Sequence, residues 1–153
     1  MSKDKLQANE SGDTAIILGG VAGGDTQIPL YSSRPQAGFP SPGDDQIEKV
    51  LDINDLVVKH PASTFFVRVE GDSMEGAGIF SGDVLVVDRS ITAKDGLIVV
   101  AAVYGEMAVK RLVARGDTHI LVSENEHYAP ITVSGHDDCF IWGVVVGSVR
   151  RFL

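Results

Sequence analysis

A serine, a lysine and a bond between two small residues are spaced in this chain so that they could cleave a peptide. Ser73 lies in a glycine-rich segment, Lys110 follows it by 37 positions in an apolar segment, and the Ala37-Gly38 bond precedes it by 36. A serine hydroxyl becomes a nucleophile when a neighbouring base takes its proton, and a neutral lysine can be that base. The three parts predict a serine endopeptidase that cleaves its own chain.

The segment that carries Ser73, residues 71–78, reads as a turn with three glycines. Glycine tolerates positive φ angles and close backbone approach, so the hydroxyl can project while backbone N–H groups face a reacting carbonyl. The N–H groups of Asp72 and Ser73 are the candidate oxyanion donors. In isolation such a serine is more often an ordinary turn residue, and the Gly-x-Ser-x-Gly motif of serine esterases is absent.

Histidine and lysine are the two side chains that could act as the base. The histidines are His60, His119, His127 and His136. They lie in polar segments without a patterned aspartate partner, so we expect them at the surface. Lys110 and Arg111 are adjacent in a strand pattern and therefore point to opposite faces. Burial disfavours the charged form of a lysine, although from the pattern alone a lysine that reaches solvent is the commoner case.

Composition limits the classes of function. The chain has 153 residues, 44% of them hydrophobic, which is enough for one domain with a sizeable core. Its net charge of −8 disfavours direct DNA binding, which needs clustered Lys and Arg. The single cysteine, Cys139, excludes an intrachain disulfide, and the spacing of possible ligands predicts no metal and no other cofactor. No membrane span or secretory signal is indicated, so we expect a cytoplasmic protein.

The sequence after Asp52 predicts many short strands separated by turns that contain Gly, Asp or Pro. Residues 53–58 fit either a short helix or an extended turn, and Tyr104-Gly105-Glu106 predicts the turn of a hairpin. The predicted strands are residues 64–70, 83–88, 97–103, 107–113, 119–123, 131–133 and 140–149. This pattern predicts a mainly β, compact fold of the sandwich or barrel type with little helix.

The first 43 residues have a different composition, with 7 of the 17 glycines and four of the six prolines. Glycine is costly to order and proline is excluded from helix interiors and central strands. We therefore predict a flexible N-terminal arm over residues 1–43, which contains the bond to be cut, and a β-rich domain over residues 44–153. Residues 16–18 and 28–31 could lie as extended pieces against a folded surface.

Several motifs together resemble the LexA/UmuD family of self-cleaving serine peptidases, over the stretch from about Leu30 to the end of the chain. They are Ala37-Gly38-Phe39-Pro40-Ser41-Pro42, Phe66 through Met74, Gly82 through Asp88, Ile91-Thr92-Ala93, Ala101 through Glu106, Val109-Lys110 and Tyr128-Ala129-Pro130-Ile131. The resemblance implies a curved, mostly antiparallel β fold that forms a homodimer. It also implies that Ser73 is the nucleophile, Lys110 the base and Ala37-Gly38 the bond cut. Residues 1–29 have no counterpart in it.

The resemblance further implies what the protein does. Cleavage, stimulated by a RecA–single-stranded-DNA filament, would remove residues 1–37. The product, Gly38–Leu153, would join the Y-family polymerase subunit UmuC in an error-prone translesion polymerase of the SOS response. The alternative is a non-catalytic dimeric adaptor or a LexA-like transcriptional regulator on the same scaffold. A signal peptidase uses similar Ser-Lys chemistry, but the chain shows no membrane anchor.

Overall fold

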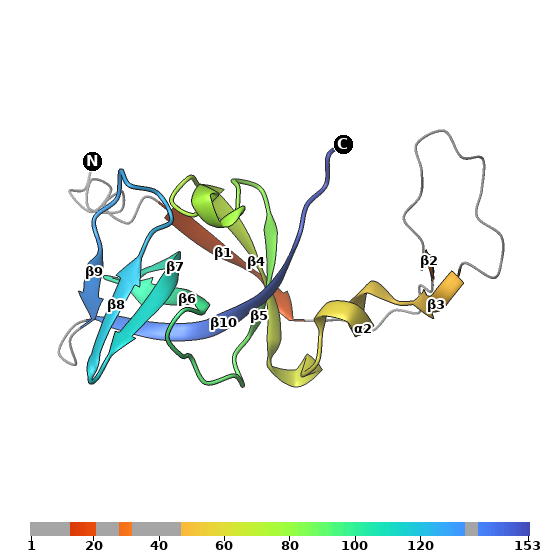
Figure 1. Cartoon of the computed structure of the whole chain (residues 1–153), viewed down its shortest axis with the longest axis horizontal. Helices are drawn as coiled ribbons and strands as arrows, with labels where there is room; N and C mark the ends of the chain where they lie inside the picture. Colours follow the sequence, from red (N-terminus) through yellow and green to blue (C-terminus); the bar gives the residue numbers. More distant parts are fainter. Residues whose placement is uncertain (1–12, 21–27, 32–46, 134–137) are drawn as a thin grey trace. The chain divides into compact units, whose positions relative to one another are not determined.

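The computed structural model describes residues 13–20, 28–31, 47–133 and 138–153 (Figure 1). Contacts divide the chain into two compact units, Met1–Val21 with His60–Leu153, and Ala22–Lys59. The predicted boundary between an arm (1–43) and a domain (44–153) stays a prediction, as does the flexibility of the arm.

The smaller unit contains one pair of strands and one short helix. Strand β2 (Ile28–Tyr31) pairs antiparallel with β3 (Ile47–Leu51), so residues 28–31 are extended as expected. Helix α2 (Ile53–Val57) begins after Asp52, whose carboxylate accepts the N–H of Asn54. Such a cap satisfies one of the N–H groups that a helix start leaves without an intrahelical partner. Of the two possibilities left open for residues 53–58, the helix is correct.

The larger unit is built on one antiparallel sheet in the order β1-β4-β5-β10-β6-β7-β8-β9, which confirms the mainly β prediction. Helix in its described residues is limited to two single 3₁₀ turns, η2 (Pro61–Ser63) and η3 (Glu75–Ala77). Each predicted strand is present within two residues of its expected ends. In chain order, the strands of this sheet, including β1, which was expected only as an extended piece at residues 16–18, are β1 (Asp13–Gly20), β4 (Thr64–Gly71), β5 (Val84–Asp88), β6 (Ile98–Val103), β7 (Glu106–Arg115), β8 (Thr118–Val122), β9 (Ile131–Val133) and β10 (Cys139–Val149).

The sheet is curved. Strand β10 is long and pairs with β5 along one part and β6 along another, with a break in register in each ladder. Such bulges bend and twist a strand, and Figure 1 shows β10 sweeping past β5 and β6. At one bend a side chain on Gly143 would lie 2.6 Å from Val87, so only glycine lets the strands approach there. Strand β1 pairs with β4 and also packs against β7, which the strand order places far across the sheet.

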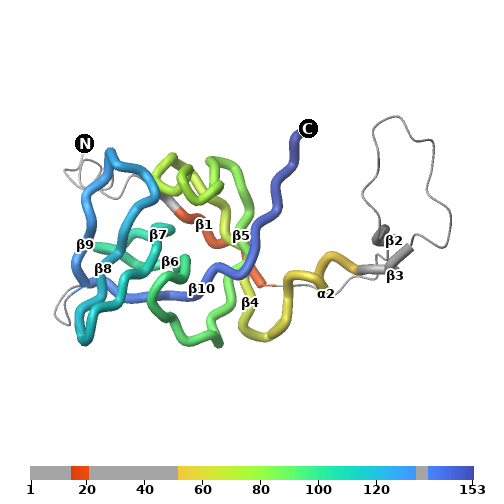
Figure 2. The backbone as a smooth tube through the Cα atoms, in the orientation of Figure 1, coloured from red at the N-terminus to blue at the C-terminus, as the bar shows by residue number. Residues whose placement is uncertain are grey.

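Two tight hairpins fix the register of β7. Its connection to β6 is the two-residue turn Tyr104-Gly105, where both residues have positive φ, 50° and 84°. This is the backbone that a type I′ hairpin turn requires, and the predicted hairpin is confirmed. The connection to β8 is Gly116-Asp117, between the paired residues Arg115 and Thr118. Figure 2 shows β6, β7 and β8 as neighbouring runs of the backbone.

The interior of this unit is lined by β-branched and other apolar residues. One cluster joins β1, β4, β5 and β7 to the segment after β4, through residues that include Val67, Leu85, Val109 and Met74. A second cluster joins β6, β7, β8 and β10, through residues that include Val99, Leu112 and Leu121. Strand β7 contributes Val109 to the first cluster and Ala108 and Leu112 to the second, so the middle of this strand lies among buried apolar side chains.

Candidate functional site

Ser73 is held by the short segment that leaves the end of β4. The strand ends at Gly71, where φ is 108°, and the turn η3 is followed by Gly78, where φ is 78°. Met74 is buried in the apolar core and its carbonyl accepts the N–H groups of Ala77 and Ile79. The anchored Met74 fixes its neighbour, so Ser73 is fully buried and held in place by the packing around it.

Lys110 lies in the middle of β7 and faces the interior, with only 1% of its surface exposed. Arg111, on the opposite face, is one-third exposed and pairs with Glu124. The expectation that these neighbours point to opposite faces is confirmed, and Lys110 is the buried one. Its Nζ lies 3.2 Å from Oγ of Ser73 and donates to it. The fold therefore brings together the serine and the lysine that the sequence analysis singled out.

A second hydroxyl contacts the same amine. Nζ of Lys110 donates to Oγ of Ser123 at 2.8 Å, and Ser123 is 8% exposed. Ser123 follows β8 directly, and the β7–β8 ladder pairs Arg111 with Val122. One further step in this register places Ser123 across from Lys110. The sequence analysis missed Ser123. The position of the Gly116-Asp117 turn could have indicated it, because a two-residue turn there fixes the register of the hairpin and so places residue 123 opposite residue 110.

Tyr128 lies beside the amine as well. The centre of its ring is 5.6 Å from Nζ of Lys110, and its hydroxyl donates to the carboxylate of Asp72. The ring therefore bridges the residue before Ser73 and the amine of Lys110. The sequence analysis quoted Tyr128 only as part of a motif and assigned it no role.

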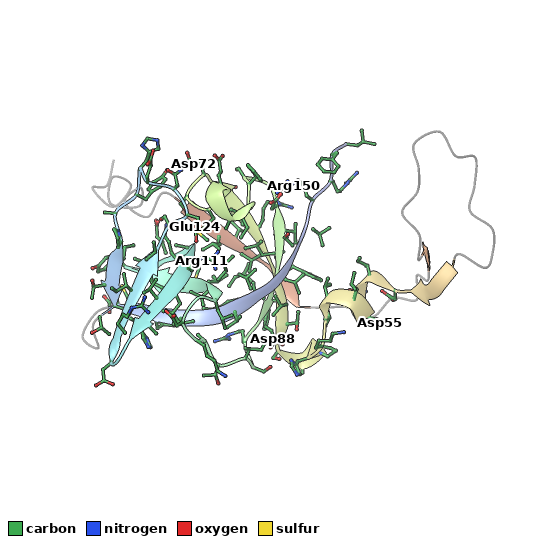
Figure 3. All side chains as sticks on the ribbon, in the orientation of Figure 1. Asp55, Asp72, Asp88, Arg111, Glu124 and Arg150 are labelled. Carbon is green, nitrogen blue, oxygen red and sulfur yellow. The ribbon has the colours of Figure 1, made fainter. Side chains whose placement is uncertain are left out.

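The segment from Ser123 to Tyr128 is tied to the Ser73 segment by further bonds. The carbonyl of Glu124 accepts the N–H of Gly76 at 2.8 Å, and Nδ2 of Asn125 donates to the carbonyl of Asp72 at 3.0 Å. A side chain on Gly76 would lie 2.5 Å from the Glu124 carbonyl oxygen, so this contact requires glycine. In Figure 3 Glu124 and Arg111, which form an ion pair, are labelled below Asp72 in the same part of the larger unit.

Some predicted features lie beyond what the structure describes or remain predictions. Ala37 and Gly38 lie outside the described residues. The part of Asp72 and Ser73 in an oxyanion site stays a prediction.

No group of three or more His, Cys, Asp or Glu among the described residues could hold a metal ion. Within the same residues, no helix is long and apolar enough to cross a membrane. Cys139 is a buried free thiol at the start of β10.

A separate polar group surrounds Asp88 at the end of β5. Its carboxylate lies 2.5 Å from Nδ1 of His60 and accepts the hydroxyls of Ser63 at 3.0 Å and Ser90 at 2.6 Å. Burial alone would raise the pKa of Asp88, but these hydrogen bonds outweigh it and lower the pKa to about 2.

The histidine at this group is exposed, as expected, with 56% of its side chain accessible, and its aspartate partner is a finding the sequence did not indicate. The serines here bond the carboxylate. This is not a Ser-His-Asp arrangement, in which the histidine contacts the serine. Of the other histidines, His127 is exposed as expected, His119 is half-buried, and His136 lies outside the described residues.

Comparison with known proteins places this chain in one family. The model of the peptidase S24-like family matches residues 29–146. The chain is 48% identical over 132 residues to protein ImpA of Shigella flexneri, covering 85% of this chain and 89% of that one. It is 42% identical over 122 residues to protein MucA of Salmonella typhimurium, covering 80% and 84%. The LexA repressor of Shewanella baltica is 38% identical over 128 residues, covering 83% of this chain and 61% of the repressor.

A β-rich scaffold with a buried serine, together with matches of this extent, defines the class. The chain belongs to the peptidase S24-like family and is a protein of the LexA/UmuD type, as its motifs predicted. Membership indicates a serine peptidase of the self-cleaving kind.

Proposed function

We propose that this chain is a self-cleaving Ser-Lys peptidase that cuts its own Ala37-Gly38 bond, with Ser73 as nucleophile and Lys110 as general base. One observation carries the proposal: the buried Nζ of Lys110 lies within hydrogen-bond distance of Oγ of Ser73. Burial disfavours the ammonium form of lysine, and a neutral amine can accept the serine proton. Family membership supports the same chemistry.

The proposed reaction has two halves. The Ser73 hydroxyl gives its proton to Nζ of Lys110 as Oγ attacks the carbonyl carbon of Ala37. The N–H groups of Asp72 and Ser73 receive the negative charge on the carbonyl oxygen. The ammonium then protonates the amine of Gly38 as the peptide bond breaks. Water, activated by the same lysine, hydrolyses the resulting ester and restores the serine. Because the bond belongs to the same protein, its effective concentration is high and modest activation suffices.

The biological setting is proposed by resemblance. The relatives MucA, ImpA and SamA are of the UmuD type, so we infer a role in damage-induced mutagenesis. The cleaved chain, as a cytoplasmic homodimer, would be a subunit of a translesion polymerase with a Y-family partner such as UmuC. A RecA–single-stranded-DNA filament would stimulate the cut. The net charge of −8 favours this role over that of a DNA-binding regulator.

Self-cleavage can be tested with the purified full chain at pH ~10, where a lysine with an ordinary pKa of about 10.4 is partly neutral. Intact mass spectrometry should detect a fragment that begins at Gly38. Ser73→Ala should abolish it, and Ser148→Ala, which removes an exposed hydroxyl on β10, should leave the rate unchanged. Continued cutting at the same bond by the Ser73→Ala protein would exclude Ser73 as the nucleophile.

The bond should be selected by size. We expect the residue before the cut to pack beneath Ser73, where alanine would fit and a branched side chain would clash. Ala37→Val should therefore block processing without altering thermal unfolding, which circular dichroism can follow. Efficient cleavage of Ala37→Trp, or a cut at another small-residue bond such as Ala22-Gly23, would refute this specificity.

A further inference from the structure

The amine of Lys110 contacts two hydroxyls, and the chemistry above uses only that of Ser73. We propose that Ser123 is a positioning residue for this lysine: it turns the amine toward Ser73 and stabilises the ammonium that forms when the serine proton is transferred. The inference rests on the proposed function and adds a residue to it.

The geometry favours Ser123 as the fixed partner. Its Oγ lies 2.8 Å from Nζ, against 3.2 Å for Ser73, so the closer contact of the amine is with the residue that does not react. A lysine side chain has several rotatable bonds and loses considerable entropy when it is ordered. A second anchor, just after the neighbouring strand β8, reduces the orientations that the amine can adopt.

The valence of nitrogen explains what the anchor does. A neutral amine has two N–H bonds and one lone pair. When one N–H donates to Ser123, the remaining freedom is a rotation that can bring the lone pair to the hydroxyl proton of Ser73. After transfer the ammonium has three N–H groups, and the bond to Ser123 persists without rearrangement. The same contact therefore serves both protonation states, and it strengthens when the nitrogen is charged.

The backbone around Ser123 is tied to the strand of Lys110 and to the segment of Ser73. The next residue, Glu124, pairs with Arg111 through its side chain and accepts the N–H of Gly76 through its carbonyl. These bonds hold the Ser123 hydroxyl in a constant place relative to both groups of the proposed reaction. Such support is what a positioning residue needs to be effective.

Other ionisable groups lie close to this amine and must be held constant in any test. The Tyr128 ring lies 5.6 Å from it, and the Tyr128 hydroxyl contacts the carboxylate of Asp72. The Arg111–Glu124 pair is formed by the residues that follow Lys110 and Ser123 in the sequence. All four groups are unchanged when only residue 123 is substituted, so a comparison of variants at that position isolates the hydroxyl.

The first measurement is the rate of self-cleavage against pH for Ser123→Ala and Ser123→Thr in the full chain. A hydrogen bond to a charged group is worth about 1.5–3 kcal/mol, which corresponds to about tenfold or more. Ser123→Ala should therefore lower the maximal rate by about tenfold and move the pH profile to lower pH by about one unit, because the ammonium loses an acceptor. Ser123→Thr, which keeps the hydroxyl, should restore both. A lower rate with an unmoved profile would indicate a merely structural role and overturn the proposal.

A second measurement separates this proposal from the peptidase proposal. In the Ser73→Ala background, ¹³Cε-labelled lysine reports the titration of Lys110 by NMR, with the resonance assigned from Lys110→Arg. Adding Ser123→Ala should lower the midpoint by about one unit, and adding Ser148→Ala should not. An unmoved midpoint would overturn the role of Ser123 even if Ser73→Ala abolishes cleavage. If Ser123→Ala shifts the midpoint but the unsubstituted chain never cleaves, the contact between Ser123 and Lys110 is upheld and the proposed function is overturned.

Discussion

Two groups of polar side chains in the larger unit, each built on one buried ionisable residue, differ in what they can do. In the first group the carboxylate of Asp88 contacts Nδ1 of His60 and accepts the hydroxyls of Ser63 and Ser90, and its pKa is lowered to about 2. Around Lys110 the amine donates to two hydroxyls. A carboxylate with this many hydrogen bonds stays ionised near neutral pH, which suits a group that only stabilises the fold. Hydroxyls can partner either state of an amine, so the second group suits proton transfer.

The largest effect should separate these two groups by activity. Lys110→Ala should reduce self-cleavage below detection at any pH, because it removes the amine that is proposed to take the Ser73 proton. His60→Asn, at the Asp88 group, should change the rate by less than about twofold. Lys94→Ala, which removes an exposed lysine, is the matched control. Cleavage followed by intact mass from pH 6 to 10 provides the comparison. A rate that titrates near 6.5 and is lost in His60→Asn would reverse the roles assigned to the groups.

A second variant tests whether the Ser73 group depends on its backbone frame. Gly76→Ala places a methyl group 2.5 Å from the Glu124 carbonyl oxygen, so one of the two segments must move. Overpacking of this kind costs up to about 3 kcal/mol. Gly78→Ala is the control, since nothing lies within 4 Å of its added carbon and only its φ of 78° opposes the change, at about 1 kcal/mol. Denaturant unfolding of both should rank Gly76→Ala as the less stable, and the opposite ranking would contradict the frame described here.

The contribution of the Asp88 group to the free energy of unfolding should depend on pH in the acid range. Its folded pKa of about 2 lies below the ordinary value of 3.8, so the ionised carboxylate stabilises the fold above pH ~4. This contribution is lost as the pH falls toward 2. Asp88→Asn should cost roughly 2 kcal/mol at pH 7, and the difference from the parent should shrink as the pH falls from 5 to 2. Urea unfolding at several pH values measures it. A difference independent of pH would mean that shape, and not charge, holds this group together.

Much of this fold could be predicted because its strands are short, apolar and punctuated by turn residues. Every strand expected after residue 60 is present, and the hairpin at Tyr104-Gly105 was visible from its glycine. The eight-strand order was not derivable, because β10 pairs with strands far from it in sequence, and bulges there alter the register.

The site was predictable in its two central residues and not in their surroundings. Neither Ser73 nor Lys110 is specific alone, and they were singled out because they occur together with a small-residue bond, within motifs that resemble one family. Ser123 and Tyr128 were not singled out, since a polar residue after a strand and a tyrosine before Ala-Pro are ordinary. His60 and Asp88 are 28 positions apart and meet only because β4 and β5 pair. Contacts of this kind follow from tertiary structure, which the local pattern does not contain.

The smallest effect should come from an ion pair outside the Asp88 and Lys110 groups. Nη1 of Arg115 lies 3.3 Å from Oδ1 of Asp95, with the two side chains 70% and 54% exposed. Arg115→Ala should change stability by about 0.5 kcal/mol or less, because water already solvates both charges. Arg150→Ala is the contrasting variant, since the carboxylate of Asp83 is almost fully buried and hydrogen bonds from Arg150 lower the pKa of Asp83. Its loss should raise that pKa and lower the thermal midpoint clearly more than Arg115→Ala does. The thermal midpoints of both variants should be measured at low and high salt. Equal decreases would contradict the argument that a buried carboxylate makes the Arg150–Asp83 contact stronger than the exposed Arg115–Asp95 contact.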